Sequence, residues 1–167
     1  MKLKRHKPKN RTDEKSLIPI RIERGIEIPA SRDEVFAYLS DLANNPRWNW
    51  AVTVTTPLDG PPRRGTRYVQ HRAGPRPGRE MLEVTSYEPP RLLAVRGELD
   101  EGRVSYHYEL TDLSPARTRL RMTVELESAI PGRGVDLYTA RLGATLSTNL
   151  EALRSVVTEV RLSAALS

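Results

Sequence analysis

The sequence predicts an α+β domain in which a curved, seven-stranded antiparallel β-sheet is followed by one long C-terminal α-helix. Three observations support this fold class. Between residues 20 and 126, seven segments alternate apolar and polar residues, as half-buried strands do. Short turns rich in Gly and Pro join neighbouring segments, which favours antiparallel pairing. From Val135 to about Leu162 the apolar spacing changes to three or four residues, which is typical of a helix.

The first strand is expected from Ile20 to Ile28, where isoleucines alternate with charged residues. Arg24 falls on the apolar side of this strand. Gly25 beside it suggests a β-bulge, and an arginine that faces a pocket is the alternative. The remaining six strands are expected at residues 48–54, 65–72, around 82–84, 93–99, 103–110 and 119–126.

A short helix is expected directly after the first strand. Ser31 and Glu34 have the spacing of a capping box, in which each residue satisfies a backbone N–H of the other. The apolar spacing predicts about three helical turns, and residues 44–46 (Asn-Asn-Pro) end them. Trp48 and Trp50 share the parity of the next apolar residues, so the second strand is expected to begin with these two tryptophans.

The C-terminal helix is expected to carry a single apolar stripe, formed by Leu142, Leu146, Asn149, Leu153, Val156 and Val160. A helix of about 27 residues is ~40 Å long and must lie against a surface of similar length. The concave face of the sheet is the available partner. We therefore expect Leu146, Leu153 and Val156 to face the sheet.

The positive charge is concentrated at the N-terminus. The 167 residues carry a formal net charge of +6. Residues 1–15 contain seven basic and two acidic residues, a net of +5, and the rest of the chain is close to neutral. We predict a flexible basic tail over residues 1–16 and a single domain over residues 17–167. A contact with nucleic acid or an anionic lipid surface is the alternative role of this tail, and it would be salt-sensitive.

Several classes of site are disfavoured by composition. The chain has no cysteine, and His6, His71 and His107 lack metal-ligand spacing, so neither a metal nor another cofactor is expected. His71 is the only plausible base, its face is ambiguous, and the parity of His107 predicts exposure, so the catalytic residues stay unknown. No apolar run approaches the ~20 residues of a membrane span. The N-terminal apolar run is too short for a signal peptide, which predicts a cytoplasmic location.

The run from Ile26 to Leu42, followed by Pro46-Arg-Trp48, resembles the opening of START-like (SRPBCC) proteins of the polyketide cyclase/dehydrase type. Residues 65–67, 84–91, 106–110 and 117–119 fit the same family in the same order. The resemblance implies a helix-grip fold, in which the curved sheet wraps the C-terminal helix and leaves a cavity between them. In this superfamily the cavity usually takes an apolar or polyaromatic small molecule.

Side chains with the apolar parity are expected to line that cavity and bind the ligand. They are Trp48, Trp50, Tyr68, Gln70, Arg72, Glu80, Tyr106, Tyr108, Met122, Leu142 and Leu146. The alternative for the tyrosines is a place in the core with a satisfied hydroxyl. Arg72 and Glu80 flank one hairpin and are expected to form a weak surface ion pair. Trp48 could instead close the junction between helix and strand.

Three functions follow from these residues. The first is a non-enzymatic carrier or sensor of an apolar or aromatic small molecule, which the lack of a catalytic constellation favours. The second is a cyclase/aromatase-like enzyme, in which a Tyr, an Arg or a carboxylate polarises a carbonyl or removes an α-proton. The third is a module that contacts nucleic acid or anionic lipid through the basic tail. The sequence leaves open whether the protein is a monomer or a homodimer.

Overall fold

The computed structural model describes residues 18–166 apart from 75–76, 100–101 and 129–133. The predicted basic tail, residues 1–16, lies outside the described residues. The elements are, in chain order, β1 (Ile18–Ile28), α1 (Arg32–Ser40), the 3-10 helix η1 (Leu42–Arg47), β2 (Val52–Pro57), β3 (Arg67–Arg72), β4 (Gly78–Glu88), β5 (Leu92–Leu99), β6 (Gly102–Ser114), β7 (Arg117–Ser128) and α2 (Val135–Ala165).

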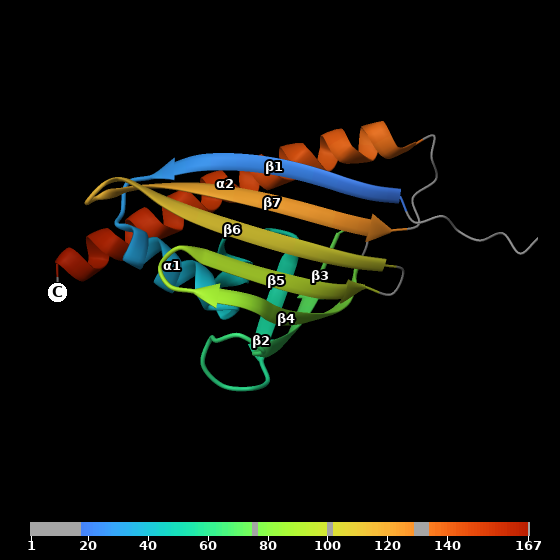
Figure 1. The fold of residues 1–167 in the computed structure, drawn as a ribbon, viewed down its shortest axis with the longest axis horizontal. Helices are drawn as coiled ribbons and strands as arrows, with labels where there is room; N and C mark the ends of the chain where they lie inside the picture. Colours follow the sequence, from blue (N-terminus) through green and yellow to red (C-terminus); the bar gives the residue numbers. More distant parts are fainter. Residues whose placement is uncertain (1–17, 75–76, 100–101, 129–133, 167) are drawn as a thin grey trace, which may run out of the picture.

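The strands form a single seven-stranded sheet in the order β1-β7-β6-β5-β4-β3-β2, and every neighbouring pair is antiparallel. β2 to β7 therefore form a meander, and β1 closes the row beside β7. α2 crosses one face of the sheet, with α1 on the same side (Figure 1). We call the face that carries α2 the inner face and the opposite face the outer face. The predicted fold class is confirmed.

β1 pairs with β7 without the β-bulge that Gly25 suggested. Its register with β7 is unbroken from Ile18 opposite Ser128 to Ile28 opposite Thr118. The β-bulge prediction is wrong because Arg24 needs no kink to lie on the inner face.

The Arg24 guanidinium instead reaches α2. Its Nε donates to the Gly143 carbonyl (3.3 Å) and to Ser147 Oγ (3.2 Å). A Cβ at Gly143 would lie 2.2 Å from one of the Arg24 nitrogens, so the glycine makes room for the arginine. Arg24 thus ties β1 to the middle of α2.

The capping box at the start of α1 is confirmed, but the predicted three-turn helix is two helices. Ser31 N–H donates to Glu34 Oε2 (2.7 Å), and Glu34 N–H donates to Ser31 Oγ (3.3 Å). The helix ends at Ser40 because Asp41 is extended and caps η1 by accepting from Ala43 N–H (3.2 Å).

The second strand begins later than the tryptophan spacing predicts. β2 starts at Val52, since preceding N–H groups are used in turns: the Asn45 carbonyl accepts from Trp48 N–H (3.2 Å) and from Asn49 N–H (2.8 Å). Trp48 is 3% exposed and closes the junction between helix and strand, whereas Trp50 is 61% exposed.

The buried face of α2 is rotated from the predicted stripe. Leu146 and Leu153 are buried as predicted, and Val156 is half-buried against the core. Val160 is 43% exposed, so its place in the stripe was wrong. Regular spacing cannot distinguish adjacent rows of a helix. Contact with the sheet and η1 selects the row of Gly143, Leu146, Asn149, Leu150, Leu153 and Val157.

Candidate functional site

Within the described residues, the inner face has one end that α1 covers and one end, called here the open end, where α2 starts. Arg24 contacts Gly143 and Pro29 accepts from Arg161, so α2 runs in the same direction as β1. The start of α2 therefore lies at the end of the sheet where β3 and β5 finish, and α1 covers the other end (Figure 1). At the end where α2 starts, half-buried side chains packed against the core include Leu99, Tyr106, Tyr138 and Leu142, and Arg72 is half-buried as well.

A chain of hydrogen-bonded polar side chains crosses the inner face toward this open end. Gln70 Oε1 accepts from Asn45 Nδ2 (2.9 Å) and from Thr55 Oγ1 (3.1 Å). Gln70 Nε2 then donates to Glu80 Oε2 (3.0 Å), and an Arg72 guanidinium nitrogen lies 3.6 Å from the same oxygen. We call these residues, together with Tyr106, the inner polar chain. Gln70 and Glu80 meet because they are register partners on β3 and β4.

The prediction that Arg72 and Glu80 form a weak ion pair on the surface is wrong about the location of the pair. The two residues do pair, but the Glu80 side chain is 1% exposed and that of Arg72 30%. Both point inward because their parity on β3 and β4 is that of the buried Tyr68 and Leu82. Burial raises the pKa of the Glu80 carboxyl, and Arg72 and the hydrogen bond from Gln70 oppose that rise.

Gly97 on β5 makes the space in which the Glu80 carboxylate lies. A Cβ at Gly97 would be 2.4 Å from Glu80 Oε1 and 2.8 Å from Val104 Cγ1. Any larger residue would force the carboxylate away. Glu80 Oε1 is buried and has no hydrogen-bond partner among the described residues. Asn45 Oδ1 and the Tyr68 hydroxyl also lack a partner among the described residues, although buried polar atoms are nearly always satisfied.

The tyrosines of β6 point to the inner face as their alternation predicts. The Tyr106 hydroxyl hydrogen-bonds with the Arg72 guanidinium and so ends the inner polar chain. Tyr108 is buried next to Met122 of β7, its register partner. Burial raises the pKa of both hydroxyls, so both keep their protons at neutral pH. Burial also raises the pKa of Tyr68 to about 12, and its hydroxyl has no partner among the described residues.

The structure brings only part of the expected lining set together. Gln70, Arg72, Glu80 and Tyr106 are joined in the inner polar chain. Other members lie in the surrounding apolar wall or at its edge: Tyr68, Tyr108, Met122, Leu142, Leu146 and Trp48. Trp50 is exposed and does not belong to that wall.

Sequence reasoning missed three residues of this site. Asn45 was interpreted only as part of the helix end, and Thr55 lies in a strand whose register was unknown. Gly97 carried a usable signal, because a lone glycine inside a strand pattern often marks a close approach of another group.

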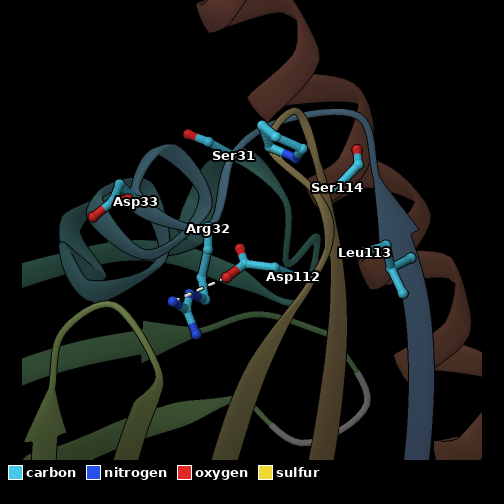
Figure 2. A pocket seen from close by; sticks show the side chains of 7 residues that line it. Ser31, Arg32, Asp33, Asp112, Leu113 and Ser114 are labelled. Atoms are coloured by element: carbon cyan, nitrogen blue, oxygen red, sulfur yellow. Dashed lines mark ion pairs between the residues drawn. The ribbon is translucent and has the colours of Figure 1, made fainter.

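Two hollows on the described part of the chain lie away from the inner face. One of about 400 Å³ is lined by residues 31–33 and 112–115 (Figure 2). Arg32 and Asp112, which both line it, form an ion pair at 2.9 Å. The other, of about 320 Å³, lies between α1 and α2 beside Tyr38 and Val160. The expected cavity between the sheet and α2 is not one of them.

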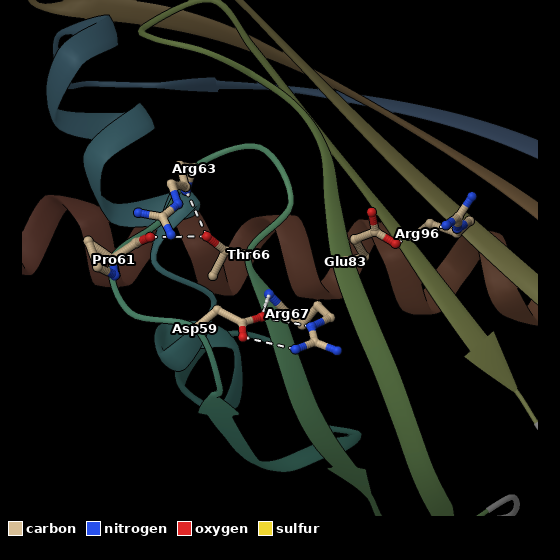
Figure 3. Close-up of polar contacts among 7 residues, drawn as sticks. All are labelled: Asp59, Pro61, Arg63, Thr66, Arg67, Glu83 and Arg96. Atoms are coloured by element: carbon tan, nitrogen blue, oxygen red, sulfur yellow. Dashed lines mark hydrogen bonds and ion pairs between the residues drawn. The ribbon is translucent and has the colours of Figure 1, made fainter.

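Ion pairs on the outer face and in the neighbouring loop are largely exposed to solvent. Arg67 donates to both oxygens of Asp59 (2.8 and 3.0 Å), and Arg96 to Glu83 (2.9 Å) (Figure 3). His71 is exposed, and His107 is half-buried rather than exposed as predicted. Within the described residues no group of three His, Cys, Asp or Glu could hold a metal ion. No helix in this part of the chain is long and apolar enough to cross a membrane.

A curved antiparallel sheet that wraps a long C-terminal helix defines a protein of the helix-grip class. The chain belongs to the polyketide cyclase / dehydrase and lipid transport family, whose model matches residues 19–158. The description of that family names cyclases, dehydrases and lipid-transport proteins.

Solved structures agree on the fold. A START superfamily protein from Mycobacterium smegmatis matches with a TM-score of 0.72 and 18% identity over 84% of this chain and 98% of its own. The Zhui aromatase/cyclase from Streptomyces sp. R1128 matches with a TM-score of 0.66 and 19% identity, and the match covers 86% of this chain and 94% of the Zhui chain. Norcoclaurine synthase from Thalictrum flavum, solved with dopamine and hydroxybenzaldehyde, matches with a TM-score of 0.66 and 15% identity. The match covers 95% of this chain and 98% of the synthase chain. No curated protein matches the chain.

Proposed function

We propose that this protein binds an apolar or aromatic small molecule on its inner face, at the open end between the sheet and the start of α2, as a carrier or sensor. The observation that carries the proposal is the inner polar chain, which runs through a mostly apolar interior and ends at half-buried Arg72 and Tyr106. Ligand sites combine a mostly apolar wall with a few convergent polar groups in this way.

The side chains beside the end of the chain supply the apolar part of the site. Tyr138 and Leu142 on α2 and Leu99 at the end of β5 are all half-buried and pack against the core. Both hollows described above lie elsewhere on the described residues, so we expect these half-buried side chains to move apart when a ligand enters here. Rotamer changes of this kind are common on binding.

The direct test is native mass spectrometry of the purified protein, which is expected to reveal a co-purified small molecule. Calorimetric titration with naphthalene then measures binding of an apolar ring, expected in the micromolar range. Leu142→Trp fills the open end and should weaken binding at least tenfold. Leu137→Trp, on the same helix at a side chain 59% exposed, is the matched control and should bind as the parent does. No binding of naphthalene and no co-purified molecule would refute the proposal.

A cyclase/aromatase-like activity is the second candidate, and the contact between the Tyr106 hydroxyl and Arg72 favours it. A protonated hydroxyl beside a guanidinium can polarise a carbonyl oxygen by donating to it. Tyr106→Phe separates the two functions. A carrier should lose at most about 1.5 kcal/mol of binding, the worth of one neutral hydrogen bond. An enzyme that uses the hydroxyl as an acid should lose roughly 10²–10⁴-fold in rate while still binding.

The third function, a contact through the basic tail, remains a prediction. Deleting residues 1–15 should abolish any salt-dependent binding to DNA or to anionic vesicles, because five of the six net positive charges lie there. The melting temperature should stay within about 2 °C of that of the full chain.

A further inference from the structure

The geometry points to a neutral ligand whose hydroxyl group, such as that of a phenol or an enol, donates a hydrogen bond to Glu80 Oε1. A ligand with a carboxylate group, such as a fatty acid, does not fit this site. This inference rests on the proposed function, since it describes what binds at the same site. Beyond that function, the inference specifies the hydroxyl group that the ligand carries and the protein atom, Glu80 Oε1, that binds this group.

The two oxygens of the Glu80 carboxylate have different surroundings. Oε2 accepts from Gln70 Nε2 at 3.0 Å and lies 3.6 Å from an Arg72 nitrogen. Oε1 is buried and has no partner among the described residues. A carboxylate oxygen only accepts hydrogen bonds, so the group that completes this site has to be a donor.

Glu80 Oε1 fits at its position because the residue beneath it is a glycine. A Cβ at Gly97 would lie 2.4 Å from this oxygen, so any other residue type at position 97 would displace it. Gly97 and Val104 are register partners in the sheet beneath the carboxylate. The sheet closes the side of Gly97 and Val104, so we expect the hydroxyl of the ligand to approach from the α2 side of the inner face.

The charges of the site select a neutral donor. Arg72 is already paired with Glu80 and hydrogen-bonded with Tyr106, so the positive charge at the open end is balanced. A carboxylate ligand at Oε1 would place two anionic groups side by side in a poorly solvated site. A hydroxyl satisfies Oε1 without adding charge.

The variant Glu80→Gln tests the inference sharply because it changes the kind of group at one atom. Gln70 Nε2 donates to the Oε2 position, so the amide oxygen of the new side chain should take that place. The amide NH₂ then replaces Oε1, and an acceptor becomes a donor at nearly constant shape. The variant also leaves the Arg72 charge unbalanced. Both changes favour a carboxylate ligand over a hydroxyl.

The experiment compares naphthalene, β-naphthol and β-naphthoate by calorimetry at neutral pH. The parent protein should bind β-naphthol about tenfold more tightly than naphthalene and should bind β-naphthoate most weakly. In Glu80→Gln the gain from the hydroxyl should disappear, and β-naphthoate should bind at least as tightly as β-naphthol. Glu83→Gln is the matched control, since this residue lies on the same strand, pairs with Arg96 and faces outward. It should leave all three affinities unchanged.

Each other outcome has a definite meaning. If the parent protein binds naphthalene and β-naphthol equally, the hydroxyl finds no acceptor; the inference fails and the proposed function stands. The same follows if β-naphthoate binds most tightly to the parent, or if Glu80→Gln alters nothing. If none of the three compounds binds and no small molecule co-purifies, the proposed function fails as well. If Glu80→Gln does not fold by circular dichroism, the order of the three compounds on the parent protein decides.

Discussion

Two glutamates on β4, three residues apart, each pair with an arginine, and the surroundings of the two pairs are opposite. Glu80 points to the inner face, and its pair with Arg72 has side chains 1% and 30% exposed. Glu83 points to the outer face, and its pair with Arg96 has side chains 42% and 43% exposed. The shorter distance belongs to the exposed pair, 2.9 Å against 3.6 Å.

The comparison shows that the residue types and the distance do not decide what an ion pair does. Water and salt screen the outer pair, so it contributes little to stability. The inner pair has lost most of its hydration, and hydrogen bonds from its neighbours have to compensate for that loss. Polar groups kept in such a place at an energetic cost are candidates for binding a ligand.

The largest contrast is expected between buried and exposed residues of α2. Leu153 is 0% exposed and belongs to the core beneath the helix, so Leu153→Ala should lower the free energy of unfolding by roughly 2–5 kcal/mol. Val160→Ala, at a side chain 43% exposed, should change it by less than about 0.5 kcal/mol. Urea unfolding of both variants measures the difference. Similar losses at the two sites would contradict the rotated face of α2.

The next effect concerns the two glutamates themselves. Glu80→Ala leaves Arg72 without its carboxylate and Gln70 without its acceptor, and should cost about 2–3 kcal/mol, since Arg72 keeps partial access to water. Glu83→Ala should cost less than about 1 kcal/mol and should cost still less in high salt. Chemical denaturation at low and high salt provides both numbers. Equal costs would remove the distinction between the two faces.

A smaller effect is expected from the space over β5. Gly97→Ala would bring a Cβ to 2.4 Å from Glu80 Oε1, and the displaced carboxylate should cost roughly 1–2 kcal/mol. Gly78→Ala, at the start of β4, meets no atom within 4 Å and should be nearly neutral. Thermal unfolding of both variants makes the comparison. A neutral Gly97→Ala would mean that the carboxylate can relocate freely.

The smallest effect is a difference in pH dependence. Burial raises the pKa of Glu80 above 4.5, so the folded protein binds this proton more readily than the unfolded chain. Stability from this group is therefore largest at low pH and declines as pH rises from about 4.5 through the raised pKa. The neighbours that face it, Arg72, Gln70 and Tyr106, do not titrate in that window. The parent should lose stability relative to Glu80→Gln as pH rises there, and a difference that is constant with pH would contradict the shift.

The sequence alone determined the features that depend on local patterns. Alternation located the seven strands, the Ser31–Glu34 spacing marked the start of α1, and the change in apolar period marked α2. These signals are reliable because each one reflects the geometry of neighbouring residues in a single element. Alternation also assigned Gln70, Glu80 and Tyr106 to one face of the sheet.

Only the tertiary structure decided which of those residues meet and which of them water can reach. Asn45 reaches Gln70 across 25 positions, and Arg24 reaches Gly143 across 119. Alternation could not tell that Glu80 would be buried while Trp50 would be exposed, nor which row of α2 would face the sheet. Parity separates two faces of a strand, but burial depends on what covers each face. At this site the cover comes from η1 and α2, which are distant in sequence from β3 and β4.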